Sequence, residues 1–249
     1  MSGSDAATTD DALLDGRVRL TQPRTGYRVA IDPVLLAASV PAVGNEIVLD
    51  VGTGVGAAAL CLATRVATCR VVGLEVQREI AQLASRNVDA NGLGDRASVI
   101  IGDLRHPPPR LAPASFAHVM ANPPYMEAAR ADPSPVASKA AATVEGEADL
   151  AAWIRFMLLM VRSGGTVTLV HRADRLDQIL ALLTARLGDM TVLPLWPGAG
   201  KPASRVLVQG RKESGGPLRL LPGIVLHGPD GRYTDAAEAV LRGGGAIAM

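Results

Sequence analysis

Aromatic residues make up only 3% of this 249-residue chain, although 48% of it is hydrophobic. The core must therefore be built from alanine, valine, leucine and isoleucine. No segment approaches the roughly 18 consecutive apolar residues of a transmembrane helix, and the stretch from Met1 to Asp11 lacks the apolar core of a signal peptide. The sequence predicts a soluble cytoplasmic protein with no membrane partner and a disordered N-terminal tail over residues 1–12.

Metal-binding patterns are also missing. The two cysteines, Cys61 and Cys69, do not have the spacing of metal ligands, and the four histidines are scattered along the chain. We expect no metal and two reduced thiols in the core. The net charge of +1 and pI of about 7.9 fall well short of a dedicated nucleic-acid-binding domain, so any attraction to RNA has to be local.

What the chain does contain, from Ile47 onward, is an alternation of short β-type runs and helical patterns, which is typical of βαβ units and a parallel sheet. Strands are predicted at Ile47–Val51, Val71–Val76, Ala97–Gly102, Phe116–Ala121, Thr166–Val170, Thr191–Leu195 and Arg205–Gln209. Helices are predicted at Val55–Val66, Arg78–Asn91, Leu150–Val161 and Leu176–Leu187, with a short one capped by Thr234. The last two strands have no helix between them, which predicts an antiparallel terminal hairpin.

A glycine-rich turn, Asp50-Val51-Gly52-Thr53-Gly54-Val55-Gly56, closes the first of these strands. Ligands of open α/β sheets bind beyond the carboxyl ends of the strands. Gly52, Gly54 and Gly56 allow a tight turn and a close approach of backbone amides to a ligand. Asp50 is expected to accept a hydrogen bond from an amino group of the cofactor.

Two further acids end the next two strands. Glu75 can accept both hydroxyls of a ribose, and Asp103 can accept the exocyclic amine of an adenine. Nicotinamide enzymes share the glycine pattern, but the added acids favour S-adenosylmethionine as the cofactor. Asp103 is also explained by the simpler alternative of a solvated acid in a turn.

The tetrapeptide Asn122-Pro123-Pro124-Tyr125 follows the fourth predicted strand. A planar amino group is a poor nucleophile because its lone pair is delocalised, and accepting hydrogen bonds from its two N–H groups frees that lone pair. The Asn122 side-chain oxygen and the Pro123 carbonyl can supply these acceptors in a preorganised site. Tyr125 offers a ring on which an extruded base can stack. These four residues are the predicted catalytic group, and Asn122 is also expected to contact the cofactor.

With these motifs, the chain resembles the class I S-adenosylmethionine-dependent methyltransferases over Leu20 to roughly Lys212. The segments Gln22–Arg28 and Ile31–Ala38 resemble, more narrowly, the bacterial tRNA (adenine-N6) methyltransferase family. The resemblance implies an α/β, Rossmann-like, seven-stranded sheet and a tRNA substrate, modified at the adenine 3′ of the anticodon in known members. It also places Asp32 near the methionine end of the cofactor, although Asp32 is equally explained as a helix cap ahead of Pro33.

The predicted organisation is a single methyltransferase domain over residues 13–249. It consists of a covering segment (13–45), a catalytic core (46–212) and a C-terminal extension (213–249). A long irregular insert at 126–148 interrupts the core and is typical of a functional loop. The sequence makes no prediction of the oligomeric state.

Basic residues flank this core and are candidates for binding RNA phosphates, or else are ordinary solvated charges. They are Arg17, Arg19, Arg24 and Arg28 before the core, and Lys201, Arg205, Arg211 and Lys212 around the terminal hairpin. Arg24, Arg28 and, in the insert, Lys139 are the predicted substrate contacts alongside Tyr125. Two other functions stay open, a protein glutamine N5-methyltransferase and a non-catalytic module that binds S-adenosylmethionine or RNA.

Overall fold

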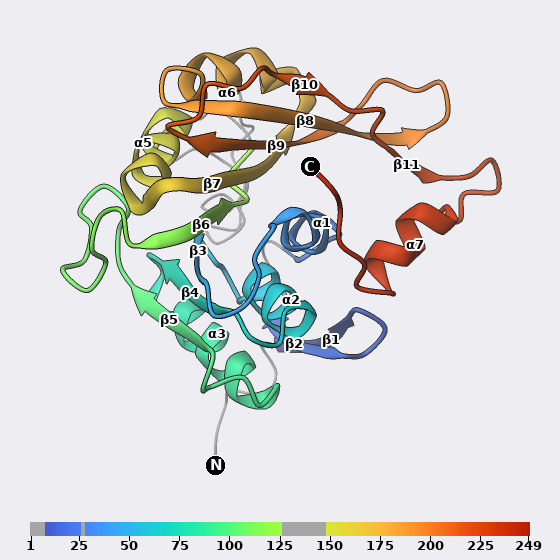
Figure 1. Cartoon of the computed structure of the whole chain (residues 1–249). Helices are drawn as coiled ribbons and strands as arrows, with labels where there is room; N and C mark the ends of the chain where they lie inside the picture. The colour runs from blue at the N-terminus through green and yellow to red at the C-terminus, as the bar shows by residue number, and fades with distance from the viewer. Residues whose placement is uncertain (1–7, 26–27, 126–147) are drawn as a thin grey trace.

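The computed structural model of the protein describes residues 8–25, 28–125 and 148–249 (Figure 1). Its centre is a nine-stranded sheet with the order β10-β8-β9-β7-β6-β3-β4-β5, and β11 also pairs with β8. The strands are β3 (Ile47–Val51), β4 (Arg70–Glu75), β5 (Ala97–Ile101), β6 (Phe116–Ala121), β7 (Val161–Arg172), β8 (Leu187–Gly198), β9 (Arg205–Lys212), β10 (Arg219–Leu220) and β11 (Ile224–His227). Strands β3 to β7 pair in parallel, whereas β9 is antiparallel to both β7 and β8. The predicted α/β fold with an antiparallel terminal hairpin is confirmed.

The sheet is wider than the seven strands predicted. β10 and β11 come from the C-terminal extension and pair in parallel with the outer edge of β8. They satisfy backbone groups that an exposed edge strand would leave unpaired. β7 and β8 also extend further than predicted. β7 pairs with β6 from Val161 and with β9 as far as Arg172, and β8 pairs with β9 from Leu187 and with β11 as far as Gly198.

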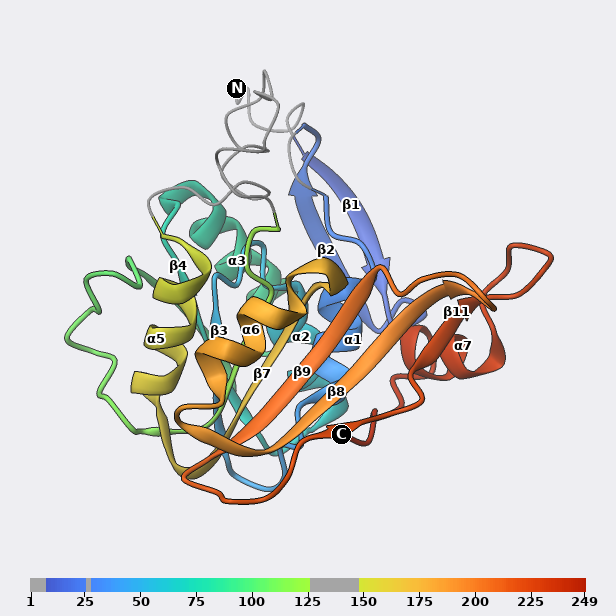
Figure 2. The same cartoon turned by 90° about the horizontal axis from the view of Figure 1, so that it is seen from above.

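Helices cover both faces of the sheet (Figures 1 and 2), and a separate hydrophobic cluster lies between each face and its helices. On one face lie α1 (Asp32–Ser39), α2 (Ala57–Arg65) and α3 (Arg78–Ala90), with α7 (Asp235–Leu241) packed against α1. On the other lie α5 (Leu150–Met160) and α6 (Leu176–Leu183). α6 ends before Leu187, which belongs to β8, and Thr234 caps α7 as predicted by accepting a hydrogen bond from Ala237 N. Cys61 and Cys69 are buried free thiols.

A separate two-stranded sheet, β1 (Thr8–Leu13) and β2 (Val18–Pro23), precedes this fold. Residues 8–12 are therefore part of a strand, and the prediction of a disordered tail over all of 1–12 was wrong for them. The hairpin is anchored on α3, where Asn87 Oδ1 accepts from Thr21 N at 2.9 Å and Asn87 Nδ2 donates to Thr21 O at 2.8 Å. Such polar anchoring leaves no hydrophobic signal in the sequence of β1.

None of the helices in the described residues is both long and apolar enough to span a bilayer. Over the same residues, no three His, Cys, Asp or Glu side chains are grouped in a way that could hold a metal ion.

Candidate active site

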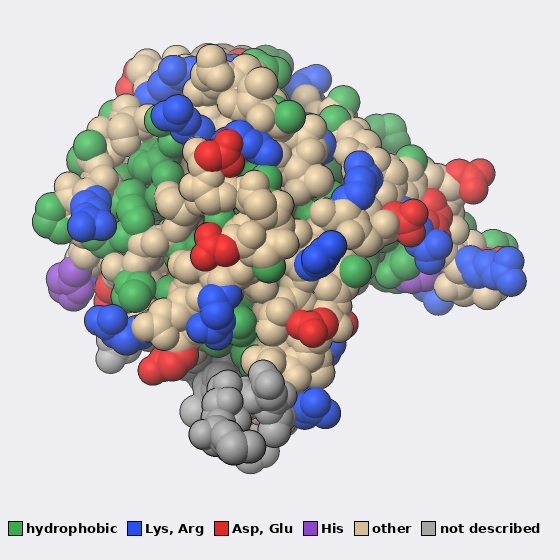
Figure 3. Space-filling model, turned by 90° about the horizontal axis from the view of Figure 1, so that it is seen from below, with side chains coloured by type: hydrophobic (Ala, Val, Ile, Leu, Met, Phe, Trp, Pro, Cys, Tyr) green, Lys and Arg blue, Asp and Glu red, His purple; other side chains and the backbone are tan. Residues whose placement is uncertain are grey.

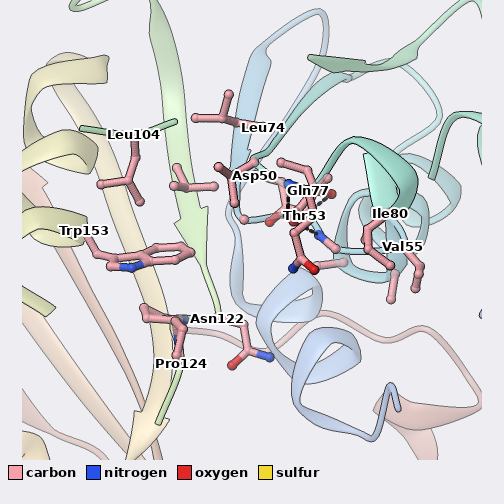
Figure 4. Close-up of a pocket in the computed structure, with 18 of the residues that line it drawn as sticks. Asp50, Thr53, Val55, Leu74, Gln77, Ile80, Leu104, Asn122, Pro124 and Trp153 are labelled. Carbon is pink, nitrogen blue, oxygen red and sulfur yellow. Dashed lines mark hydrogen bonds between the residues drawn. The ribbon is translucent and has the colours of Figure 1, made fainter. Parts of the chain in front are cut away.

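A cavity of about 360 Å³ opens at the carboxyl ends of the parallel strands, within the size range of small-molecule sites. Figure 4 shows Leu104, Trp153, Pro124 and Asn122 on one side of it and Thr53, Val55, Gln77 and Ile80 on the other. Most of the predicted site residues line this cavity, namely Asp50, Gly52, Gly54, Glu75, Asp103, Asn122, Pro123, Pro124 and Tyr125.

The glycine turn forms the floor of the cavity. Gly52 and Gly54 have φ angles of +66° and +57°, in the left-handed region that other residues rarely adopt. A Cβ on Gly52 would lie 2.3 Å from Cη2 of Trp153, so this glycine also makes room for the indole ring. Gly56 does not line the cavity; it is the N-cap of α2.

Asp50 is buried beneath the turn and accepts a hydrogen bond from Thr53 Oγ1 at 2.7 Å. Burial raises the pKa of the Asp50 carboxyl to about 7, against the opposing effect of hydrogen bonds from Thr53 and the Ala59 amide. The charge on Glu75 raises it further. Asp50 is therefore close to its titration point near neutral pH, and a cation placed beside it would favour the ionised form.

Glu75 is held by backbone amides at the end of β4. Its two carboxylate oxygens accept from Gly54 N at 3.0 Å and from Gln77 N at 2.9 Å. Burial raises the pKa of the Glu75 carboxyl above its ordinary value. Each oxygen keeps a second lone pair for a ligand hydroxyl, so the geometry suits the predicted ribose contact.

Asp103 lies at the cavity rim, where Arg105 competes with a ligand for its carboxylate oxygens. Arg105 donates to its two carboxylate oxygens from Nε at 3.2 and 3.1 Å and from Nη2 at 2.7 Å. These hydrogen bonds hold the pKa of the Asp103 carboxyl below its ordinary value. An adenine amine would have to share Asp103 with the guanidinium.

The Asn122–Tyr125 segment follows β6, and three elements distant in sequence surround Tyr125. Its hydroxyl oxygen lies 2.5 Å from Asn122 Oδ1 and 2.6 Å from Asp32 Oδ2, at the start of α1. The Arg205 guanidinium lies over its ring at 4.5 Å from the centroid, and His171 meets the ring edge-on at 5.4 Å. Arg205 thus occupies one ring face, and a stacked base would have to use the other.

Sequence reasoning misplaced or missed some of these residues. Asp32 does not line the cavity and makes no helix-cap hydrogen bond; its side chain points to Tyr125 and Arg205 instead. Trp153 was not predicted, although a tryptophan on an aromatic-poor apolar helix face could have marked it. His171 was also missed; it is fully buried and meets the Tyr125 ring edge-on.

The predicted substrate-binding residues are not all at the site. Arg28 is tied to Asp11 of the hairpin at 2.7 Å, and Arg24 is exposed beside Pro23 and Thr25, which do line the cavity. Lys139 and nearly all of the insert at 126–148 lie outside the described residues.

Comparison with known proteins identifies methyltransferases as relatives of this chain. A family model described as a methyltransferase domain matches residues 48–145. The tRNA1(Val) (adenine(37)-N6)-methyltransferase of Aeromonas hydrophila is 30% identical over 218 residues, covering 85% of this chain and 87% of the relative. The chain belongs to the class I S-adenosylmethionine-dependent methyltransferases. The methyltransferase with the same name from Tolumonas auensis is 28% identical over 67% of this chain and 68% of its own length.

Solved methyltransferase structures share the fold. A protein of Agrobacterium tumefaciens described as a predicted O-methyltransferase superposes with a TM-score of 0.73 at 26% identity, covering 88% of this chain and 99% of its own. The geranyl diphosphate C-methyltransferase of Streptomyces coelicolor, solved with S-adenosyl-L-homocysteine, has a TM-score of 0.52 at 13% identity and covers 72% and 74% of the two chains. At that identity the likeness concerns the fold alone.

The lining of the cavity fits the cofactor of this methyltransferase, S-adenosylmethionine. Buried carboxylates at Asp50 and Glu75 match an ammonium and a pair of ribose hydroxyls, and Ile80 and Leu104 provide apolar surface. Gly54 has open space where a Cβ would stand, so its backbone can approach a ligand closely.

Proposed function

We propose that this methyltransferase transfers a methyl group to an exocyclic amino nitrogen, and that its acceptor is the N6 amine of an adenine in tRNA. The observation that carries the proposal is the position of Asn122-Pro123-Pro124-Tyr125 on the wall of the cofactor cavity. The Aeromonas relative matches 85% of this chain, and its name supports adenine in tRNA as the acceptor.

We assign some residues of the site to the cofactor and others to the acceptor amine. Asp50 would hold the amino group of the methionine moiety, Glu75 would hold the ribose, and the glycine turn would line the space between them. When bound, S-adenosylmethionine supplies an electrophilic methyl group. Asn122 and the carbonyl of Pro123 accept hydrogen bonds from the acceptor amine, which concentrates its lone pair on nitrogen, and positioning provides most of the rate enhancement.

The test is a transfer assay with labelled S-adenosylmethionine and bulk tRNA from a strain that lacks this enzyme, followed by nucleoside mass spectrometry. We expect N6-methyladenosine. Asn122→Ala should abolish transfer and leave cofactor affinity within a few-fold of wild type. A parallel reaction contains release factor in place of tRNA. Label found only there would replace this proposal with glutamine methylation, the activity named for a Chlorobaculum tepidum relative that is 32% identical over 46% of this chain. Cofactor binding with no acceptor would favour a non-catalytic module.

Electrostatic attraction to tRNA should be modest. Figure 3 shows Lys and Arg side chains interspersed with Asp and Glu over the face it presents. Most of the predicted phosphate contacts already have partners in the protein: Arg17 with Arg242 O, Arg28 with Asp11, Arg205 with Asp32, Arg211 with Gly164 O, and Lys212 with Leu158 O and Val161 O.

Arg19, Arg24 and Lys201 are exposed. If these three contact phosphates of a single-stranded loop, log K should fall with log salt with a slope of about −2. A slope steeper than about −5 in a filter-binding titration would contradict this assignment, because it requires many more phosphate contacts than these residues provide.

A further inference from the structure

The hydroxyl of Tyr125 makes two short contacts that one proton cannot serve. Its oxygen lies 2.6 Å from Asp32 Oδ2 and 2.5 Å from Asn122 Oδ1. A phenol carries a single hydrogen, whereas a carboxylate and an amide oxygen are both acceptors. With the groups in these orientations, one of the two contacts would join two oxygens with no proton between them.

The ion pair of Arg205 with Asp32 determines which of the two Tyr125 contacts receives the proton. Arg205 Nε lies 3.3 Å from the same Asp32 oxygen, and the Asp32 side chain is only 12% exposed. As the acidic partner of this ion pair, Asp32 is an ionised carboxylate that accepts hydrogen bonds and donates none. The Tyr125 proton therefore goes to Asp32, and the remaining lone pair of the hydroxyl faces Asn122.

A lone pair on Tyr125 requires a donor on Asn122. A half-turn of a carboxamide exchanges its oxygen and its NH2 group with almost no change in shape, and the hydrogen-bonding partners determine which orientation is adopted. In the orientation that satisfies Tyr125, the Asn122 NH2 group donates to the phenol. The amide oxygen then faces away from Tyr125.

We propose that Asp32 and Arg205 are positioning residues that act through Tyr125 to fix the orientation of the Asn122 carboxamide. The relay runs from the Arg205 guanidinium to the Asp32 carboxylate, the Tyr125 hydroxyl and the Asn122 NH2 group. It presents the Asn122 oxygen, rather than the NH2 group, to the N–H bonds of an acceptor amine in the cavity. This inference rests on the proposed amine acceptor, and it gives Asp32 a role other than the cofactor contact predicted from the sequence.

A double-variant cycle tests the relay, with single-turnover rate and cofactor affinity measured for each protein. Asn122→Asp puts two carboxylates on one phenol proton and should lower the rate at least about 100-fold, as for loss of one preorganised group. Asp32→Asn permits either polarity and should lower it about tenfold. In the double variant, the new carboxamide at position 32 can donate to the phenol, and Tyr125 can donate to the new carboxylate at position 122.

The double variant should therefore be at least about tenfold faster than Asn122→Asp alone. Cofactor affinity should stay within a few-fold throughout. Asp235→Asn is the matched control, because Asp235 also stands in the first turn of a helix but far from Tyr125 in sequence and on α7; its rate should equal wild type. Additive losses in the cycle, or an Asp32→Asn enzyme that loses cofactor affinity instead of rate, would overturn the proposal.

A spectroscopic measurement separates the relay from the proposed function. In protein labelled with ¹⁵N-asparagine, the Asn122 side-chain amide is assigned by its loss in Asn122→Asp. We expect one of its protons to exchange slowly with solvent in wild type and quickly in Tyr125→Phe. Equal, fast exchange in both would refute the relay. Slow exchange in a protein that methylates no amine would leave the relay standing and refute the acceptor.

Discussion

Replacing Gly52 by alanine should damage both the stability of this enzyme and its cofactor site. The new methyl carbon would stand 2.3 Å from Cη2 and 2.9 Å from Cζ3 of Trp153. The indole is a rigid ring on α5, packed in the cluster beneath the sheet, so it cannot yield like the end of a flexible chain. Displacement toward the open side would bring it into the cofactor cavity, which it already lines.

Two effects set the magnitude. Holding alanine at a φ near +66° costs about 1–2 kcal/mol, and overpacking a filled site costs about 1–3 kcal/mol. The sum is about 2–5 kcal/mol of unfolding free energy, or roughly 4–20 °C in Tm for a domain of this size. Urea denaturation and thermal unfolding measure this loss, and calorimetry with S-adenosylhomocysteine measures the accompanying loss of affinity.

Gly54→Ala is the matched control. Gly54 has nearly the same backbone conformation, but no atom of the described residues lies within 4 Å of its added Cβ, so this variant should lose only the backbone part, about 1–2 kcal/mol. Gly52→Ala combined with Trp153→Leu should recover about 1–3 kcal/mol relative to additivity, because the smaller side chain removes the overlap. Equal stability of the two alanine variants, or an additive cycle, would refute the reasoning.

Three further predictions concern buried titratable groups. Burial raises the Asp50 pKa to about 7. As pH increases toward 7, wild-type affinity for S-adenosylmethionine should therefore increase by up to about tenfold per pH unit, and above pH 7 it should level off. Calorimetry from pH 6 to 8 should show no pH dependence of affinity for Asp50→Asn, and its absence in the wild type would contradict the assignment. Burial lowers the His171 pKa to about 4, so the native state binds fewer protons than the unfolded chain between pH 4 and 6.5. The native state therefore loses up to about 3 kcal/mol of stability as pH falls through this range. His171→Phe should abolish that part of the acid sensitivity in urea denaturation, and an unchanged pH dependence would show that other groups cause it. Glu75→Gln should leave one of the amides of Gly54 and Gln77 facing an NH2 group, which costs about 1–3 kcal/mol of stability and weakens cofactor binding. Wild-type stability of this variant in urea denaturation would contradict that cost.

The cofactor half of the site could be predicted because its residues lie at or just beyond the carboxyl ends of strands. Asp50 is the penultimate residue of one parallel strand and Glu75 the last residue of the next, and parallel neighbours bring their carboxyl ends to one edge of the sheet. Order along the chain was therefore enough to place them together. Trp153 lies outside this rule, because nothing in the sequence pairs a helix residue with Gly52.

The N-terminal hairpin could not be predicted for a different reason. Hydrophobic periodicity is the main sequence signal for strands, and the first strand, Thr8–Leu13, is largely polar. It is ordered by backbone pairing with β2 and by side-chain contacts such as those of Asp11 with Gln22 and Arg28. Such contacts depend on the folded geometry rather than on a pattern of residue types.

The acceptor half shows how one antiparallel strand changes which residues reach a site. A parallel strand contributes the residues at its end, but β9 runs against β7, and its first residue, Arg205, pairs with Arg172 at the carboxyl end of β7. The start of β9 therefore lies at the same edge as the ends of β6 and β7, where Tyr125 and His171 stand. Sequence position alone grouped Arg205 with basic residues of the hairpin surface. Lys201 is exposed and Arg211 donates to Gly164 O, whereas the reversal of one strand directs Arg205 to Asp32 and the tyrosine ring.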